Sequence, residues 1–200
     1  MISTDAGSPL VSGIQAYISL LSQWNRTISL TTVTDPEEIV RFHFGESLFA
    51  AYSVPIAGGR LADVGSGAGF PGLPLKMLLP QLHLTMIEAN AKKVAFLEEV
   101  CRRLPLDQTE TFRGRMEQFD RKDAVGLPAR FDFIAARAFG QFDELMEWSA
   151  AHLVETGELV LWLGEEDVAA ISRKAGWTWG IAEKIPGSER RYILAGSPRR

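Results

Sequence analysis

Three glycines in alternate positions mark the part of the chain best suited to bind a ligand. Gly65, Gly67 and Gly69 follow a short apolar run that contains Asp63. Glycines at such a turn let the backbone bend sharply and approach a ligand closely, because no Cβ stands in the way. The next apolar run ends in Glu88, whose carboxylate could accept two hydrogen bonds from a ribose diol. Together the glycines and the acid predict a binding site for a nucleotide-containing cofactor.

The glycine spacing favours a cofactor without a phosphate group. A dinucleotide fingerprint reads G-x-G-x-x-G and would place its third glycine at Phe70. Pro71 and Pro74 would delay the helical turn on which a pyrophosphate sits, and no Gly-Lys-Ser/Thr follows to cradle a triphosphate. We therefore expect S-adenosylmethionine, which has a ribose and an adenine but no phosphate. A glycine-rich turn in an α/β enzyme of another kind is the alternative.

The composition limits the class of protein. Its 200 residues are 46% hydrophobic, which is enough for one sizeable core. A single cysteine excludes a disulfide framework, and the three histidines share no ligand spacing, so we expect no metal site. Because no apolar run reaches about 18 residues, we expect no membrane segment. The single cysteine fits a reducing cytoplasm, and we expect a monomer there. The net charge of -4 argues against general attraction to nucleic acid, so we expect RNA contact only through a localised basic surface, and no DNA partner.

The pattern of apolar residues predicts two parts. Residues 9–24 have helical periodicity, and Asp35 with Pro36 predicts the start of a second helix that runs to about residue 52. Strands and helices then alternate, as in a parallel sheet covered on both faces. The predicted strands are 60–64, 83–88, 109–113, 131–136 and 157–163, and the predicted helices are 72–79, 90–104, 141–153 and 165–175. Two last strands, 177–184 and 190–195, form a hairpin.

This order of elements is typical of the class I S-adenosylmethionine-dependent methyltransferases. We expect an α/β fold with a Rossmann-like seven-stranded sheet that ends in an antiparallel hairpin. Residues 59–200 would form this methyltransferase domain, and residues 1–58 would form an N-terminal helical cap.

Several motifs resemble those of one family. The most specific is Asp63–Pro74, which is similar to the D-V-G-T-G-x-G-F-P-G-x-P loop of the bacterial RsmG (GidB) methyltransferases. Other motifs similar to that family's are Trp24-Asn25 with Ser29-Leu30-Thr31, Asp35-Pro36-Glu37 with His43–Leu48, Lys92-Lys93 with Phe96-Leu97, Gly114–Glu117, and Arg137-Ala138-Phe139. The resemblance spans nearly the whole chain. It implies methyl transfer from S-adenosylmethionine to N7 of a guanine in 16S ribosomal RNA, on the small ribosomal subunit or its precursor.

The resemblance also implies roles for particular residues. Cofactor binding is implied for Gly65, Phe70, Met116, Glu117 and Arg137, beside Asp63, Gly67, Gly69 and Glu88. Three arginines are the implied catalytic and RNA-facing residues: Arg115, Arg137 and Arg190. The chain departs from the family at two positions, since Leu163 stands where a Lys is usual and Ala136 replaces a Ser.

The chemistry of N7 methylation agrees with the residues present. Guanine N7 has a lone pair and no proton, so its attack on a sulfonium methyl needs alignment and no general base. Positive charge moves toward the purine during transfer, so we expect Arg137 to contact guanine O6, a phosphate or the cofactor carboxylate and to leave N7 free. Because N7 is out of reach inside an RNA duplex, the target must be unpaired or flipped out.

Two other functions stay open on the sequence alone. The departures at Leu163 and Ala136, with the acidic net charge, would suit a methyltransferase of the same fold that acts on another RNA or a small molecule. The third hypothesis is a non-catalytic ribosome-binding relative with a relict cofactor pocket. The intact glycines, Asp63 and Glu88 argue against it.

Overall fold

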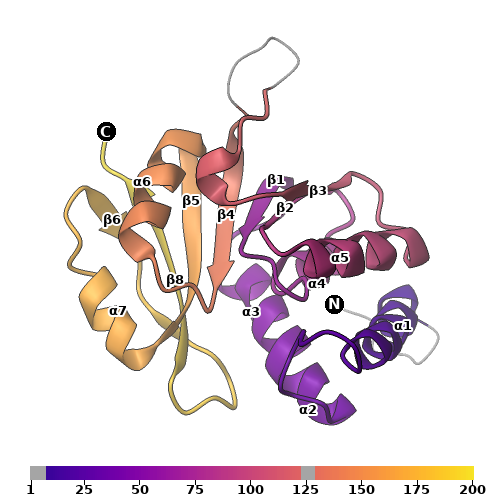
Figure 1. Ribbon diagram of the computed structural model, residues 1–200. Coiled ribbons are helices and arrows are strands. Elements are labelled where there is room, and N and C mark those ends of the chain that lie inside the picture. The colour runs from indigo at the N-terminus through magenta and orange to yellow at the C-terminus, as the bar shows by residue number, and fades with distance from the viewer. Residues whose placement is uncertain (1–7, 123–128) are drawn as a thin grey trace.

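A mixed sheet of eight strands with helices on both faces organises residues 8–122 and 129–200, which this computed structural model describes (Figure 1). The first five strands run parallel in the order β3-β2-β1-β4-β5, and β8 and then β6 continue the sheet antiparallel. The short strand β7 also pairs with β8. The strands are β1 Gly59–Val64, β2 Leu82–Glu88, β3 Thr109–Arg113, β4 Phe131–Arg137, β5 Leu153–Gly164, β6 Trp177–Trp179, β7 Glu183–Lys184 and β8 Arg191–Pro198.

Helices lie on both sides of this sheet, with α1, α4 and α5 on one side and α6 and α7 on the other (Figure 1). The amino-terminal helices are α1 Pro9–Trp24, α2 Pro36–Ile39, the π-helix η1 Val40–Gly45, and α3 Glu46–Ser53. The later helices are α4 Gly72–Leu78, α5 Ala91–Arg103, the 3-10 turn η2 Met116–Gln118, α6 Phe142–His152 and α7 Glu165–Ile171.

The sheet divides the hydrophobic core into two clusters because successive strand residues point to opposite faces. Leu61 of β1 belongs to the cluster that contains Phe96 of α5, whereas its neighbour Ala62 belongs to the cluster that contains Trp148 of α6. Buried runs on both faces are what a parallel sheet between helices requires. The sequence expectation of a sheet covered on both faces is confirmed.

The amino-terminal helices share the first core cluster with the sheet. Asp35 caps the second helix, since its Oδ1 accepts hydrogen bonds from the backbone N–H groups of Glu37 and Glu38, both at 3.0 Å. Tyr17 of α1 stacks on Phe70 with ring centroids 5.4 Å apart. These helices therefore pack against the loop that follows β1. The predicted division between residues 58 and 59 falls in the link between α3 and β1 and stays a prediction.

Two details differ from the sequence expectation. The helix expected from residue 36 to about 52 contains the π-helical stretch η1. The strand expected over 177–184 is broken after Trp179 into β6 and β7, so the sheet has eight strands where seven were expected. Trp177 and Trp179 still lie on one face, as strand periodicity requires, and their rings stack with centroids 5.3 Å apart. Finally, within the described residues no helix combines the length and apolar character needed to cross a membrane.

Candidate active site

The predicted site lies where the order of the parallel strands reverses. β1 pairs with β2 on one side and with β4 on the other, so the connections after β1 and β4 lead away in opposite directions. Ligands of such sheets bind at the carboxyl ends of the strands beside this switch point. The glycine loop begins there, and Gly65, Gly67 and Gly69 have φ values of 73°, 57° and 87°. Residues that carry a Cβ rarely adopt this left-handed backbone conformation, which is why these positions of the loop are glycine.

Glu88, at the end of β2, holds the glycine loop in place. Its Oε2 accepts a hydrogen bond from the Gly67 N–H at 2.9 Å, and its Oε1 accepts one from the Asn90 N–H at 2.8 Å. The Gly65 N–H also donates to the carbonyl of Ile87 at 2.9 Å. Each carboxylate oxygen keeps a second acceptor position, so Glu88 can still bind hydroxyl groups of a ligand.

A cavity of about 140 Å³ lies beside this loop and contains several of the predicted residues. Its lining includes Gly65, Glu88, Arg115, Met116 and Glu117, which come from three separate segments of the chain. The structure therefore brings these five predicted residues together. Their roles stay predictions.

Phe139 lines the same cavity, although sequence reasoning named it only as part of a motif. The preceding residue, Ala138, has a φ of 53°, which is uncommon for a residue with a Cβ. A Cβ at Gly65 would lie 3.3 Å from the Phe139 ring, so the ring closely covers the glycine. Strained residues of this kind concentrate at functional sites. Here the strained residue makes the turn between Arg137, which contacts the amino-terminal helices, and Phe139, which lines the cavity.

Asp63 lies beneath the loop and is fully buried. Its Oδ2 accepts a hydrogen bond from the Gly72 N–H at 3.1 Å, whereas its Oδ1 is buried without a partner among the described residues. Burial, with a smaller contribution from the charge of Glu88, raises the pKa of Asp63 from 3.8 to about 7. A carboxyl group whose pKa lies so close to neutral pH, beside a binding loop, is typical of a functional site.

Arg137, the last residue of β4, is held by the amino-terminal helices. Its Nη2 donates to the carbonyl of Phe42 at 2.9 Å and to Glu46 Oε2 at 2.7 Å. The same Glu46 oxygen accepts from Arg191 Nη1 at 3.1 Å. Sequence reasoning missed Glu46 and Arg191, although Glu46 lies within a quoted motif and Arg191 follows the predicted Arg190. No local pattern distinguishes the arginine that is folded against Glu46 from its neighbour.

His43 of η1 completes this group of polar side chains. Its Nε2 is hydrogen bonded to the Thr31 hydroxyl at 2.7 Å, and its ring stacks on Phe70 with centroids 4.7 Å apart. Burial, followed by the positive charges of Arg137 and Arg191, lowers the pKa of His43 to about 4. The ring is therefore neutral at pH 7 and packs against the loop. Across the described segments, no three His, Cys, Asp or Glu side chains are grouped as a metal site would require.

Other predicted residues lie outside the cavity. Phe70 packs among the aromatic rings of Tyr17, His43 and Phe44 and is not one of the lining residues, so the structure places it against the helices. Arg190 is exposed in the segment before β8. Of the two departures from the family, Leu163 is 3% exposed within the core cluster that contains Trp148, and Ala136 is buried in the same cluster. A Lys at position 163 would place its side-chain stem in that apolar cluster.

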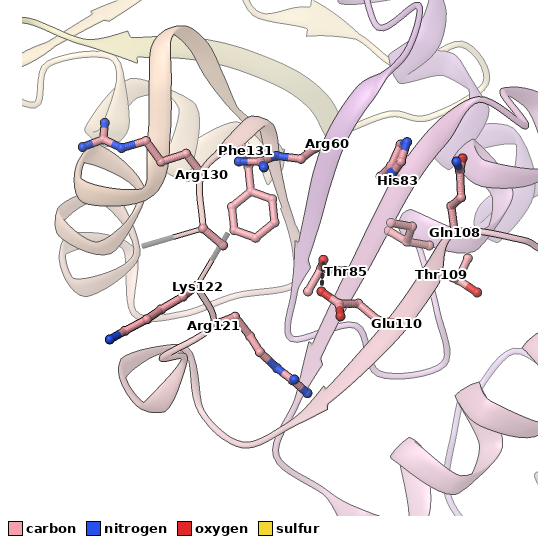
Figure 2. Close-up of a pocket in the computed structure, with 12 residues that line it drawn as sticks. Arg60, His83, Thr85, Gln108, Thr109, Glu110, Arg121, Lys122, Arg130 and Phe131 are labelled. Carbon is pink, nitrogen blue, oxygen red and sulfur yellow. Dashed lines mark hydrogen bonds between the residues drawn. The ribbon is translucent and has the colours of Figure 1, made fainter. Parts of the chain in front are cut away.

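A larger cavity, of about 420 Å³, lies at the opposite edge of the sheet (Figure 2). It is found at the amino ends of the parallel strands, where Thr85 donates a hydrogen bond to Glu110 Oε1 at 2.8 Å. The basic residues that line it are Arg60, His83, Arg121, Lys122 and Arg130. Cofactors of doubly wound sheets bind at the carboxyl ends, so size does not make this cavity the cofactor site.

Comparison with known proteins decides the family. The family model described as GidB, rRNA small subunit methyltransferase G, matches residues 11–177. The chain belongs to the GidB family. Membership confirms the resemblance seen in the sequence, and it makes the chain a methyltransferase with S-adenosylmethionine as its cofactor.

Individual proteins similar to this GidB chain support the same family assignment. Ribosomal RNA small subunit methyltransferase G of Xanthomonas euvesicatoria pv. vesicatoria is 35% identical over 212 residues, covering 96% of this chain and 95% of that protein. The protein of the same name from Methylobacillus flagellatus is 32% identical over 205 residues, covering 100% of this chain and 94% of that protein. The O-methyltransferase from Bacillus cereus, solved in complex with SAH, superposes with a TM-score of 0.66 at 13% identity, covering 93% of this chain and 90% of that chain. At that identity the likeness concerns the fold, and it confirms the class I methyltransferase architecture.

Proposed function

We propose that this GidB chain transfers a methyl group from S-adenosylmethionine to N7 of an unpaired guanine in 16S ribosomal RNA. The observation that carries the proposal is the cavity in which the glycine loop, Glu88 and the turn η2 meet at the switch point of the sheet. The substrate class is supported by the curated relatives, which are named for the RNA of the small ribosomal subunit. The RNA would be bound within the small subunit or its precursor, by a monomeric enzyme of the cytoplasm.

The residues around the cavity fit the parts of the cofactor. S-adenosylmethionine, when bound, supplies a methyl group on a positively charged sulfur. Glu88 would accept hydrogen bonds from the ribose hydroxyls, and Met116 and Phe139 would pack against the adenine. Asp63 Oδ1 is a buried acceptor without a partner among the described residues, and a cofactor ammonium group would satisfy it. We include Gly65 and Glu117, which line the cavity, and Gly67 of the same loop, whose backbone would come close to the ligand.

The protein has no proton to remove in this reaction. Guanine N7 carries a free lone pair, so the side chains need only exclude water and align the base with the methyl group. His43, with a pKa lowered to about 4 chiefly by burial, adds no positive charge at pH 7. Arg137 is a largely buried cation, and the hydrogen bonds of its Nη2 to the Phe42 carbonyl and to Glu46 hold the guanidinium in place, so that it would not turn toward N7. Such an arrangement keeps N7 nucleophilic.

Exposed arginines at the carboxyl end of the sheet would hold the RNA backbone. Arg115 lies at the cavity itself, and Arg190 and Arg191 lie where β8 begins. Phosphate contacts from Arg side chains position an RNA without reading its sequence. Because the net charge of the chain is -4, binding must depend on these few residues and should weaken with salt.

One observation favours a second candidate function. Leu163, in the family position of a Lys, is buried in the core and offers no group to a phosphate or base. A methyltransferase of the same fold with another RNA or a small molecule as its substrate would explain that change.

Transfer of tritiated methyl groups separates the two candidates. The protein would be incubated with labelled S-adenosylmethionine and with 16S RNA or small subunits from a strain that lacks the gene, and the labelled base would be mapped by N7-specific chain cleavage. We expect a single labelled guanine in 16S RNA and none with the Arg137→Ala variant. Cofactor binding without labelling of either substrate would favour the second candidate.

A further inference from the structure

A group of polar contacts around one buried acid connects the amino-terminal helices to three strands beside the site. Its centre is Glu46, the first residue of α3, whose side chain is only 3% exposed. Its carboxylate binds Arg137 of β4 and Arg191 of β8, and its backbone carbonyl accepts from the Trp162 indole of β5 at 2.8 Å. Arg137 and Trp162 are paired neighbours in β4 and β5, so Glu46 contacts both of them at the carboxyl ends of these strands.

These contacts leave one nitrogen of the Arg137 guanidinium, Nη1, without a hydrogen-bond partner among the described residues. Nη2 is occupied by Glu46 and by the Phe42 carbonyl. Nη1 is buried and has no hydrogen-bond partner in the part of the chain that the structure describes. A buried donor without a partner is costly. A guanidinium is well suited to bind an oxyanion in that position, since its planar donors match carboxylate and phosphate geometry.

The π-helix η1 places the acceptors for Arg137. Phe42 lies within η1, and Glu46 follows it directly. Segments of π-helix are rare and are frequently found at functional sites. Phe42 offers its carbonyl to Arg137, and the His43 carbonyl accepts from the Ser47 hydroxyl at 2.6 Å. The local helix geometry is therefore adapted to the contact with β4.

We propose that Glu46 is a positioning residue for methyl transfer, which fixes Arg137 so that its free Nη1 side binds an oxyanion of the reacting complex. The oxyanion is either the carboxylate of the cofactor or a phosphate of the RNA. The proposal rests on the proposed function. Stability alone is a poor explanation for Glu46, because replacing a buried ion pair by apolar residues is often neutral or stabilising.

Charge compensation is the second part of this role. Burial lowers the pKa of Arg137, and the negative charge of Glu46 is the strongest influence in the opposite direction. Arg191 cannot replace Glu46, since it is also a cation and its side chain is 54% exposed. Without the Glu46 charge, Arg137 would lose both its fixed geometry and its compensating partner.

Three variants test the proposal. Glu46→Gln keeps the shape and removes the charge, whereas Glu46→Asp keeps the charge. The control is Glu110→Gln, which neutralises an exposed acid at the other end of the sheet, hydrogen bonded to the Thr85 hydroxyl. A displacement of about 1 Å can lower a rate about a hundredfold, and we expect a loss of that order in kcat for Glu46→Gln. Glu46→Asp should recover most of that loss, and Glu110→Gln should behave as the unmodified protein does.

Binding measurements on the folded variants identify the oxyanion. If it is the cofactor carboxylate, calorimetry will show that Glu46→Gln weakens S-adenosylmethionine binding about tenfold while the affinity for 16S RNA is unchanged. If it is an RNA phosphate, the RNA affinity will fall and the cofactor affinity will not. Unchanged kcat and unchanged affinities in Glu46→Gln would overturn the proposal. It would also be overturned if the loss of activity in Glu46→Gln were explained by a lower melting temperature and Glu46→Asp did not restore activity. Absence of any RNA methylation by the unmodified protein would refute the proposed function, whereas the two affinities would still report on Glu46.

Discussion

Replacing Asp63 with Asn should change how the stability of the protein depends on pH. Asp63 is fully buried, and burial raises its pKa from 3.8 to about 7. The folded protein therefore keeps a proton between these two pH values that the unfolded chain has released. For a carboxyl whose pKa is raised on folding, stability is greatest below the unfolded pKa and falls as the pH rises toward the folded pKa.

The size of the effect follows from the two pKa values of Asp63. One unit of difference corresponds to about 1.4 kcal/mol, so ionisation of this group alone should lower the free energy of unfolding by about 2.5 kcal/mol between pH 5 and pH 8. Asn cannot ionise, and its side-chain oxygen can still accept the hydrogen bond from Gly72 that Asp63 Oδ2 accepts at 3.1 Å. The Asp63→Asn variant should therefore become more stable relative to the unmodified protein as the pH rises.

Urea unfolding at several pH values, without cofactor, measures this difference. Other titrating groups such as His43 are present in both proteins, so their contributions cancel when the two curves are subtracted. We expect the difference in free energy of unfolding to grow by about 2.5 kcal/mol from pH 5 to pH 8, mostly below pH 7. A difference that stays constant within about 0.5 kcal/mol would refute the assignment of Asp63 as a buried acid that ionises near pH 7.

Three further outcomes follow from the same region. If Asp63 faces the cofactor's ammonium group, the affinity for S-adenosylmethionine should rise between pH 6 and pH 8, and calorimetry should find no such rise in Asp63→Asn. Ala138→Gly should raise the free energy of unfolding, measured in urea, by about 1 kcal/mol, because it relieves the strain of a φ of 53°. A free energy of unfolding below that of the unmodified protein would contradict this. Gly69→Ala should lower the melting temperature more than Gly176→Ala does, since a Cβ at Gly69 would overlap the Tyr17 hydroxyl whereas Gly176, with a φ of 80°, has open space around it. Equal losses in the two variants would show that only backbone strain matters.

Local signals in the sequence predicted most of the elements and the loop that they position. Asp35 with Pro36 predicted the start of the second helix, and the alternating glycines predicted a loop with left-handed residues. Both signals depend on residues that are close together in the chain, so they can be recognised in a single sequence. The break between β6 and β7 was missed although Gly180 stands at it, since a glycine inside a strand pattern is compatible with a bulge as well as with an end of the strand.

The charge cluster around Glu46 could not be found in the same way. Glu46 lies 91 residues before Arg137 and 145 residues before Arg191, and only the fold brings the three together. Sequence reasoning identified Arg137 through a motif and chose Arg190 in place of its neighbour. Which of two adjacent arginines turns inward depends on the pairing of β8 with β5, and pairing of distant strands is not visible in a local pattern.

Titration of the protein with S-adenosylmethionine tests most directly that the glycine loop after β1 is the cofactor site. The measurement compares the unmodified protein with Gly67→Val, in which a branched side chain occupies a position with a φ of 57°. Gly176→Val is the matched control, because Gly176 also has a left-handed φ, of 80°, and lies in open space. We expect the unmodified protein and Gly176→Val to bind the cofactor and folded Gly67→Val to bind none. Retained affinity in Gly67→Val would contradict the assignment of the loop, and with it the proposed site of methyl transfer.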